Sequence, residues 1–416
     1  MAYNKKLLYV SEAPTWITEA GSLGTINQSG NPISNINLSA AEFFNDVITY
    51  SVTSGSLPTG LSLDSSTGVI SGTLTGYNTF VTVDFSITAT DSEGESNERD
   101  FSLNVSAEYD ISYLAVAGGG GTGTRHSGGG GAGGYIESIF QNTASGTSFS
   151  ISVGSGGAGG VGSNENEAPG QNGGNTTIST SSFTITAIGG GAGATYFNNG
   201  TSGTSSSGGS GGGAPYNGSQ GSGTSGQGNS GGDDGEPYSK IAGGGGGGAT
   251  QSGFNPSSTP HGGAGYLSTI TGSNVYFAGG GGGAQWDRAE DSSAGNGGIG
   301  GGGGGGAADA STSPPAAGLG GTGGLNNGGN GNQASNGGDA TGGDGGANTG
   351  GGAGGSGQGS YSTYVYNDNA ANGGSGVVIL RFPTANYSGI TTGSPTVTTD
   401  GTDTILTYTG SGTYTA

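Results

Sequence analysis

Runs of glycine fill the chain from Tyr113 to Phe382 and leave it few ways to fold. The stretch opens within ISYLAVAGGGG and closes with GGSGVVILRF, two apolar segments that each need a partner. Glycine has no side chain to bury, and in a helix interior it costs roughly 1 kcal/mol relative to alanine. An ordinary apolar core and a helical fold are therefore both excluded. The clearest runs are Gly128–Gly134, Gly154–Gly162, Gly208–Gly213, Gly243–Gly248, Gly279–Gly283 and Gly297–Gly306.

Two interpretations of these runs remain. Gly/Ser-rich tracts are commonly flexible linkers. The runs here, however, have similar lengths, and the loops between them carry aromatic residues. The ordered structure that suits glycine is the polyproline-II-like helix, which has three residues per turn and no internal hydrogen bonds. Its amides and carbonyls must be met by neighbours. We therefore predict a bundle of such helices, held together by backbone hydrogen bonds between neighbouring segments.

Several pieces of this stretch resemble a known family. They read LAVAGGGG, GGAGGYI, FSISVGSGGAGG, FTITAIGGGAG, YFAGGGGGAQW and GGSGVVILRF. The pattern resembles the glycine-rich domain of phage tail and appendage proteins, and it is similar to the glycine-rich tip adhesins of T-even-like phages. The resemblance implies a sandwich of polyglycine helices. It also implies that loops at the distal end contact a host receptor.

Residues 12–106 are predicted to form a separate all-β sandwich, because short alternating strands follow one another between turns. Its stretch LPTGLSLDSSTGVISGTLTG resembles an immunoglobulin-like family that is common as a spacer in surface proteins. The resemblance implies that Leu57, Leu61 and Ile70 belong to the core. The expected strands are Val47–Val52, Gly68–Leu74, Val81–Thr90 and Arg99–Val105.

The remaining parts are short. Residues 1–11 are predicted to be an attachment arm or a first strand. Residues 112–383 form the glycine-rich domain, and residues 384–416 are a β appendage in which Thr404–Gly410 and GTYTA form a hairpin. The whole chain is thus expected to be all-β and non-helical.

Composition excludes several classes of function. With seven Lys and Arg residues and a net charge of −21, the chain cannot neutralise a phosphate backbone, so we expect no nucleic-acid binding. It has no cysteine for disulfides, thiol chemistry or zinc. No apolar stretch is long enough to cross a membrane, and MAYNKKLLYV lacks the features of a signal peptide. A protein that suits a saline exterior without an export signal fits release by lysis, as virion proteins are released.

The glycine-rich domain can be given a polarity. If the strands beside the runs gather into one sheet, they define a base, and the loops at the other end of the runs define a tip. The base strands are Ile111–Ala117, Tyr135–Phe140, Phe149–Val153, Phe183–Ile188, Tyr266–Ile270, Val275–Ala278 and Val377–Phe382. The tip loops are Thr122–Ser127, Ser163–Asn172, Thr195–Ser207, Thr250–His261, Gln285–Asn296 and Gln358–Asn372. Between Gly297 and Gly357 the pattern assigns no direction.

These tip loops carry aromatic and cationic residues, including both histidines of the chain. Flat aromatic faces suit sugar stacking and interface anchoring, so we predict an exposed receptor-binding surface. The alternative is that the same side chains cap the ends of the bundle against water. The candidates are Arg125, His126, Tyr196, Phe197, Phe254, His261, Trp286, Arg288, Tyr361, Tyr364 and Tyr366.

Catalytic and cofactor signals are weak. The repeated GxGxxG patterns lack a βαβ unit, and no P-loop lysine is present, so we predict no enzyme activity and no cofactor. Asp91, Glu93 and Glu95 are calcium candidates, and the alternative is an acidic hairpin turn. A second acidic group, Asp233 to Glu236, is interpreted as a solvated charge cluster.

These observations predict a phage virion protein, a tail fibre or appendage adhesin in which an immunoglobulin-like spacer carries the glycine-rich domain. Its expected partners are other virion proteins at the N-terminal region, a host glycan or outer-membrane protein at the tip, and copies of itself in a homo-oligomer. Membrane insertion is not expected. Two alternatives stay open: a capsid or tail decoration or fibril subunit without a ligand, and an ice-binding protein with flat glycine-helix faces.

Overall fold

The computed structural model describes residues 12–28, 31–42, 46–77, 80–162, 167–197, 201–234, 241–286, 293–309, 313–335, 338–358 and 370–416. The chain divides into two compact units. The N-terminal unit comprises Met1–Asp110, Gln141–Thr147 and Ala416, and the glycine-rich unit comprises Ile111–Phe140 and Ser148–Thr415. The described chain is all-β, and its one helical element is a short 3-10 turn, η1 (Thr384–Asn386). No helix in the described ranges is long and apolar enough to cross a membrane.

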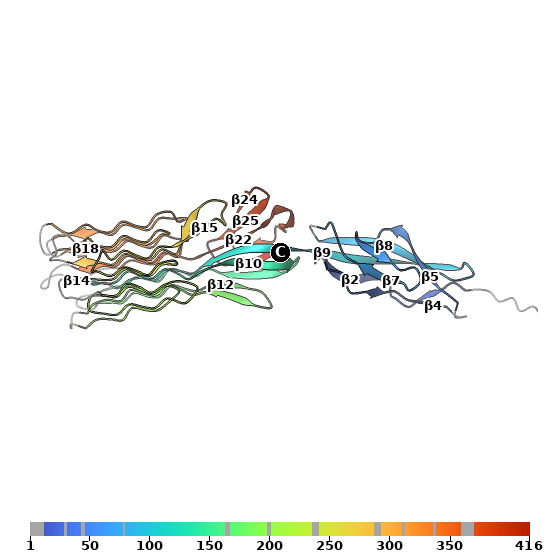
Figure 1. Cartoon of the computed structure of the whole chain (residues 1–416), viewed down its shortest axis with the longest axis horizontal. Helices are drawn as coiled ribbons and strands as arrows, with labels where there is room; N and C mark the ends of the chain where they lie inside the picture. The colour runs from blue at the N-terminus through green and yellow to red at the C-terminus, as the bar shows by residue number, and fades with distance from the viewer. Residues whose placement is uncertain are drawn as a thin grey trace, which may run out of the picture. The chain divides into compact units, whose positions relative to one another are not determined.

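The N-terminal unit is a β-sandwich (Figure 1). In its larger sheet, β9 lies between β8 and β2, and β5 pairs with the other side of β8. A second sheet has the order β3-β7-β6, and β1 pairs with β4. The bounds are β1 (Thr15–Trp16), β2 (Gly21–Gln28), β3 (Ile36–Asn37), β4 (Ala40–Ala41), β5 (Thr49–Gly55), β6 (Leu61–Leu63), β7 (Val69–Gly72), β8 (Val81–Thr90) and β9 (Ser96–Val116).

An apolar core holds this unit together. Alternate residues of β8 and β9, such as Ile87 and Leu103, point into it and are fully buried. Trp16 packs edge-on against Phe101 with 5.4 Å between ring centroids. Ile70 is fully buried there as well, and Leu57 and Leu61 pack against the same cluster, which confirms the predicted core residues.

The longer β-strands of the glycine-rich unit gather at one end, here called the strand end (Figure 1). They form several sheets, so the prediction of a single basal sheet is wrong. One has the order β9-β22-β25-β24, with β10 on β9; a second has the order β13-β12-β11-β26-β23; and β15 pairs with β16. The bounds are β10 (Tyr135–Ala144), β11 (Ser148–Ser152), β12 (Thr176–Ser179), β13 (Thr184–Ala187), β15 (Tyr266–Ser268), β16 (Val275–Phe277), β22 (Val377–Pro383), β23 (Thr391–Thr392), β24 (Thr396–Asp400), β25 (Asp403–Tyr408) and β26 (Gly412–Thr415).

The C-terminal segments belong to these sheets, and the predicted hairpin around Gly410 is wrong. Strand β25 pairs with β22 and β24, whereas β26 pairs with β11 and β23. The chain crosses from one sheet to the other at Gly410 because each strand finds apolar neighbours in a different layer. Tyr414 of β26, for example, stacks on Phe382 of β22 at 4.9 Å and lies over Phe149 of β11 at 6.3 Å.

Away from the strand end, the unit is a sandwich of polyglycine-II helices, as predicted. The segment Gly279–Ala284 shows why, because residues three apart in it donate to the same neighbouring segment. Such a repeat requires three residues per turn. The three pairs are Gly279 and Gly282 to the carbonyls of Gly300 and Gly303, Gly280 and Gly283 to those of Gly263 and Pro260, and Gly281 and Ala284 to those of Gly130 and Ser127.

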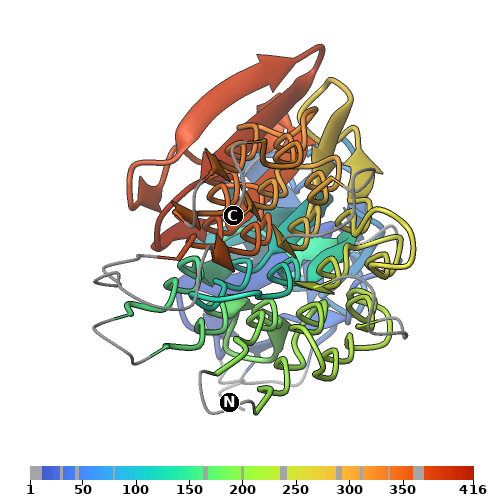
Figure 2. The same cartoon turned by 90° about the vertical axis from the view of Figure 1, so that its left-hand side faces the viewer.

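Close approach of backbones explains the glycine content. A Cβ atom built on Gly281 would lie 1.7 Å from the carbonyl oxygen of Ala353, and one on Gly120 would lie 2.2 Å from that of Gly191. Neither neighbour can yield, because each of these oxygens belongs to another helix of the bundle. Figure 2 looks along the bundle and shows the helices end-on as small coils packed side by side.

At the opposite end of the bundle, here called the loop end, the strands among the described residues are two residues long (Figure 1). A sheet with the order β14-β17-β18-β19 lies there, and β20 pairs with β21. The bounds are β14 (Ile241–Ala242), β17 (Gln285–Trp286), β18 (Ala307–Ala308), β19 (Gln333–Ala334), β20 (Asp339–Ala340) and β21 (Gly357–Gln358).

The structure also assigns the direction of the chain between Gly297 and Gly357. The chain turns at the strand end near Gly323 and again near Thr349, whose carbonyls accept hydrogen bonds from Tyr276 and Ala278 beside β16. Between these turns it returns to the loop end, where β19 and β20 lie. The passes alternate in direction without any longer strand to mark them, which is why the sequence pattern gave no polarity here.

Candidate functional site at the loop end of the glycine-rich unit

The entrances of several predicted tip loops lie together at the loop end. A Cβ atom on Gly357 would lie 2.9 Å from the carbonyl oxygen of Gln285, although the two residues are far apart in sequence. The Ser127 amide donates to the carbonyl of Ser356 at 3.2 Å, which brings a third loop to the same place. The prediction that loops Gln285–Asn296 and Gln358–Asn372 begin on one end of the bundle is confirmed for their described residues.

The loop predicted at Thr250–His261 is only partly at this end. The amides of Ala249 and Thr250 donate to the carbonyls of Ala278 and Ala264, so this part of the loop lies at the strand end. The chain then travels along the bundle and turns at Asn255–Ser258, where the Ser258 amide donates to the Asn255 carbonyl. The prediction is wrong for the first residues, because the predicted loop contains a short segment that runs along the bundle from the strand end to the loop end.

Arg125 is held in a closed arrangement and is not exposed. Its guanidinium Nη1 lies 3.0 Å from Oε1 of Glu167, and both side chains are about nine-tenths buried. The guanidinium also lies over the ring of Tyr196, 5.4 Å from its centroid. The Tyr196 amide in turn donates to the Arg125 carbonyl at 3.1 Å. Sequence reasoning missed Glu167, because nothing in the pattern pairs a glutamate with an arginine some forty residues earlier.

His126 is buried beside this ion pair, with 4% of its surface exposed. Its ring lies 5.1 Å from the ring of Trp286 and 6.1 Å from that of Tyr196. Burial first, and the neighbouring charge of Arg125 second, together lower the pKa of His126 to about 3. The imidazole is therefore neutral at physiological pH.

Trp286 is also buried, with 4% of its surface exposed, so the prediction of an exposed indole is wrong. It forms a small apolar cluster with Ala308 and Ala340, and Ala334 packs against the same cluster. The physical reason is that Trp286 lies in β17, which pairs with β14 on one side and with β18 on the other, and small alanine side chains close over the indole. A buried tryptophan at the end of the bundle fits the capping role left open above.

Two candidate aromatics beside this ion pair, Tyr196 and Phe197, are half-buried and therefore partly accessible. Tyr216, which sequence reasoning missed, is half-buried and meets Tyr196 edge-on at 5.3 Å. Its amide donates to the His126 carbonyl at 3.1 Å, so the turn after Ala214 belongs to the loop end. The sequence signal for this turn was present in Pro215, Asn217 and Gly218, a typical turn composition.

Phe254 and His261 form a separate pair. Phe254 is 37% exposed, and its ring meets that of the half-buried His261 edge-on at 6.0 Å. Nδ1 of His261 accepts a hydrogen bond from the Asn296 amide at 2.9 Å, and burial lowers the pKa of this histidine. The neutral ring thus keeps its proton on Nε2 and offers a donor there.

The other predicted site residues, Arg288, Tyr361, Tyr364 and Tyr366, lie outside the described residues, as does the predicted attachment arm at residues 1–11. The assignment of these four residues to a receptor-binding surface stays a prediction.

The calcium candidates in the N-terminal unit lie in a tight turn. Asp91 is buried, and its Oδ1 accepts hydrogen bonds from the amides of Glu93 and Glu95, both at 2.9 Å. The side chains of Glu93 and Glu95 are exposed. This arrangement is the acidic hairpin turn of the alternative interpretation. The described residues contain no group of three or more histidine, cysteine or acidic side chains that could hold a metal ion.

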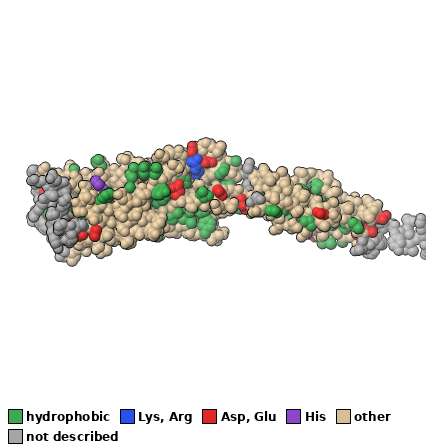
Figure 3. All heavy atoms as spheres, in the orientation of Figure 1, with side chains coloured by type: hydrophobic (Ala, Val, Ile, Leu, Met, Phe, Trp, Pro, Cys, Tyr) green, Lys and Arg blue, Asp and Glu red, His purple; other side chains and the backbone are tan. Residues whose placement is uncertain are grey.

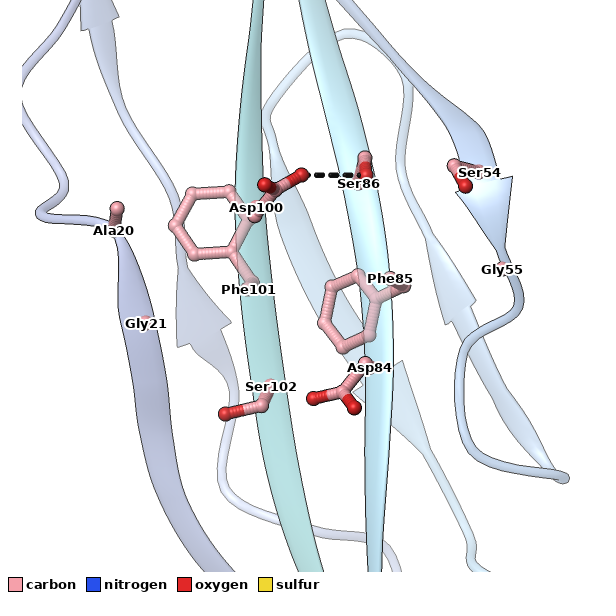
Figure 4. Close-up of a pocket in the computed structure, with 10 residues that line it drawn as sticks. All are labelled: Ala20, Gly21, Ser54, Gly55, Asp84, Phe85, Ser86, Asp100, Phe101 and Ser102. Carbon is pink, nitrogen blue, oxygen red and sulfur yellow. Dashed lines mark hydrogen bonds between the residues drawn. The ribbon is translucent and has the colours of Figure 1, made fainter.

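A cavity of about 390 Å³ lies on the N-terminal unit, between β2 and β5 (Figure 4). Asp84 and Asp100 line it, and Oγ of Ser86 donates to Oδ1 of Asp100 at 2.7 Å. The described lining offers carboxylates and hydroxyls but no basic side chain. We therefore assign it no reaction.

Comparison with known families agrees with this two-part architecture. Residues 95–325, more than half of the chain, match the family described as "Glycine-rich domain", and the chain belongs to this family. Residues 13–106 match the family described as "Putative Ig domain". The N-terminal unit is therefore called the immunoglobulin-like unit from here on. Together, the two domains fit a surface or adhesin-type structural protein.

Solved structures resemble the chain only weakly. N-cadherin EC1-4 of Drosophila is 16% identical and has a TM-score of 0.20, with 23% of this chain and 25% of that chain covered. Human protocadherin-24 EC1-2 is 21% identical and has a TM-score of 0.20, with 22% of this chain and 43% of that chain covered. An endo-fucoidan hydrolase of glycoside hydrolase family 107 is 12% identical and has a TM-score of 0.20, with 42% of this chain and 28% of that chain covered. The chain thus spans less than half of each, and scores this low support no conclusion. No curated protein matches the chain.

Proposed function

We propose that the chain is a bacteriophage virion protein, a tail fibre or appendage adhesin that binds a host cell-surface receptor through the loop end of its glycine-rich unit. The observation that carries this proposal is the convergence of loop entrances, with Ser127, Gln285, Ser356 and Gly357 side by side at one end of a hydrogen-bonded bundle. Binding residues are typically found on loops that a rigid scaffold positions.

The receptor in this proposal is a host glycan or an outer-membrane protein. Phe254 presents an exposed ring beside an imidazole donor, and Tyr196 and Tyr216 are partly accessible. Such aromatic faces suit both sugar stacking and protein anchoring. The N-terminal region attaches the chain to other virion proteins, copies of the chain form a homo-oligomer, and lysis releases the protein to the exterior. The proposal includes no enzyme activity, no cofactor, no nucleic acid and no membrane insertion.

A structural protein without a ligand is the second candidate, and the burial of Arg125, His126 and Trp286 favours it. These three residues close the end of the bundle whether or not anything binds there. In this alternative the chain is a capsid or tail decoration or a fibril subunit, and the loop end is only a cap.

Adsorption of the labelled protein to a panel of whole bacterial cells separates the two candidates. We expect saturable binding to a host strain, and we expect its loss when Phe254, Tyr361, Tyr364 and Tyr366 are replaced together by alanine. Trp286 is left intact, because its removal would open a cavity in the cap. Val397→Ala is the matched control, since Val397 is 46% exposed in β24 at the strand end. Binding to no strain supports the structural alternative, and binding unchanged by the four substitutions rejects the loop end as the receptor site.

A further inference from the structure

In the outer helices of the glycine bundle, some backbone amides donate to side chains and not to neighbouring backbone carbonyls. In the segment Gly189–Ala194, the amides of Gly190 and Gly193 donate to the carbonyls of Gly118 and Gly121. This is the three-residue repeat found throughout the bundle. The same segment has further amides that point in other directions around the helix.

On one side of this helix, asparagine side chains accept the hydrogen bonds that backbone carbonyls accept inside the bundle. The amides of Gly189 and Ala192, again three residues apart, donate to Oδ1 of Asn175 at 2.8 Å and to Oδ1 of Asn172 at 2.9 Å. Both asparagines are exposed. Their carboxamides therefore occupy the place of a missing neighbouring backbone at the surface of the bundle.

The same contact recurs elsewhere in the unit. Oδ1 of Asn296 accepts from the Leu319 amide at 2.9 Å, Oδ1 of Asn330 accepts from the Gly320 amide at 2.8 Å, and Oδ1 of Asn372 accepts from the Gly159 amide at 3.0 Å. Each of these three asparagines is also exposed.

A second hydrogen bond accompanies each of four such contacts. Asn172, Asn296, Asn330 and Asn372 are each followed by glycine, and the amide of that glycine donates to the neighbour that the asparagine contacts. In each case a glycine amide donates to a backbone carbonyl: Gly173 to that of Gly190, Gly297 to that of Leu319, Gly331 to that of Gly318, and Gly373 to that of Gly157. We call these four dipeptides, Asn172-Gly173, Asn296-Gly297, Asn330-Gly331 and Asn372-Gly373, the Asn-Gly clamps.

The geometry of the three-residue screw explains the clamps. Consecutive residues point about 120° apart around such a helix, so a surface asparagine is followed by a glycine that faces its neighbour. In three clamps the two contacted groups of the neighbour are two residues apart, as with Gly159 and Gly157. In the fourth clamp both groups belong to Leu319, where the two segments run parallel, as the donations from Ala294 to Ala316 and from Gly297 to Leu319 show.

We propose that the Asn-Gly clamps close the lateral edges of the bundle and prevent a second copy of this chain from adding to it. An unclamped outer helix would present a row of amides at three-residue spacing, which is the surface that a further glycine helix recognises. Sheet edges with unpaired amides invite pairing for the same reason, and proteins protect such edges with local side-chain devices. The inference does not depend on receptor binding, because it concerns the sides of the bundle and not its loop end.

The test is a full-length variant in which the four clamp asparagines are replaced by alanine. We expect amide exchange at Gly159, Ala192, Leu319 and Gly320 to accelerate on the order of tenfold, the effect of losing about one hydrogen bond. We expect light scattering to show larger assemblies than the wild-type chain forms at equal concentration. Exchange of Gly190 and Gly193, which donate to backbone carbonyls, should stay slow and report that the bundle is folded.

Two controls accompany this variant. Gln171→Ala removes an exposed carboxamide next to Asn172 whose side chain bonds none of the groups in the described part of the chain, and it should change neither exchange nor mass. An aspartate series at the four positions keeps the accepting oxygen, as Asp344 does when its Oδ1 accepts from the Asn372 amide at 2.7 Å. This series should retain both protection and mass.

Unchanged exchange in the alanine variant overturns the proposal, and so does faster exchange without larger assemblies. An aspartate series that exchanges as fast as the alanine series overturns it as well. If the fourfold alanine variant does not fold, the single variant Asn172→Ala replaces it. Unchanged amide exchange at Ala192, or no increase in assembly mass at high concentration, then overturns the proposal.

Discussion

The two units of this chain solve the folding problem in opposite ways. The immunoglobulin-like unit packs large side chains such as Trp16, Phe85 and Phe101 into one apolar core. In the bundle of the glycine-rich unit, backbone meets backbone, and the buried apolar clusters lie at its two ends. On the face drawn in Figure 3, most of the described surface is backbone or side chains that are neither hydrophobic nor charged, and charged groups are few.

This difference reverses the usual rules for substitution. In an apolar core the buried volume stabilises, so removing atoms costs free energy. In the glycine bundle the absence of side-chain volume lets the hydrogen bonds form, so adding atoms costs free energy.

The largest effect is expected for Gly281→Val in the middle of the bundle. The new Cβ atom would lie 1.7 Å from the carbonyl oxygen of Ala353, which accepts from Gly130. The neighbouring helix must move, and several backbone groups lose partners at roughly 1–3 kcal/mol each. Hydrogen exchange read by mass spectrometry should show loss of protection throughout the glycine-rich unit.

Peptides from the immunoglobulin-like unit serve as the internal reference in that experiment and should keep their protection. A glycine-rich unit that remained as protected as in the wild-type chain would contradict the close-packed bundle.

In the immunoglobulin-like unit, removing side-chain volume should have the large effect. Ile87→Ala should destabilise this unit by about 2–5 kcal/mol, because it leaves a cavity in a fully buried site. Chemical denaturation followed by tryptophan fluorescence measures the change, since Trp16 belongs to the same core. Val52→Ala provides the comparison, as Val52 is 37% exposed on β5 and should cost far less. Equal effects of the two substitutions would show that side-chain burial does not hold this unit.

An acid-dependent effect of intermediate size is expected at His126 in the cap of the bundle. Its pKa is about 3 in the folded chain and near 6.5 when unfolded, so the unfolded chain binds the extra proton between these values. The stability from the neutral imidazole is present above pH 6.5 and is lost as the pH falls toward 3. The slope approaches about 1.4 kcal/mol per pH unit.

The matched variant is His126→Gln, which does not titrate and retains His261. Urea denaturation of both proteins between about pH 7 and pH 4 should show the wild-type chain losing stability relative to the variant. A constant difference across this range would mean that the imidazole is not buried in the cap.

The outline of the fold could be predicted from the sequence, for physical reasons specific to each part. The glycine runs permit one ordered backbone, and the alternating strand at Val81–Thr90 and the apolar strand at Val377–Phe382 are nearly as expected in β8 and β22. The position of the loops that begin at Gln285 and Gln358 followed from the glycine run and the strand that lie beside each of them, one bundle length away. The same reasoning failed at Thr250 because a short pass of only a few residues carries no strand to mark it.

The detailed chemistry of the loop end was harder to predict. Exposure depends on which neighbours close over a residue, and the partner of Arg125 and the alanines under Trp286 come from distant passes of the chain. The Asn-Gly clamps were visible in the sequence as dipeptides but carried no meaning until the neighbours were known. Asn217-Gly218 shows the ambiguity, since there the same dipeptide forms a turn, with Asn217 at φ 53°.

The smallest effect is expected for Gly410→Ala, and it tests what glycine contributes to the same unit outside the bundle. No atom lies within 4 Å of a Cβ built on Gly410, and its φ is not in the left-handed region. Alanine therefore fits without strain, and it restricts the unfolded chain more than glycine does. The expected result is a gain of about 0.4–1 kcal/mol, measured by urea denaturation beside Gly281→Ala, whose added methyl group meets the Ala353 carbonyl. If both alanine variants lost the same amount of stability, close backbone approach would not be the reason for glycine in the bundle. Opposite signs at the two positions would locate that reason in the packing of one helix against the next.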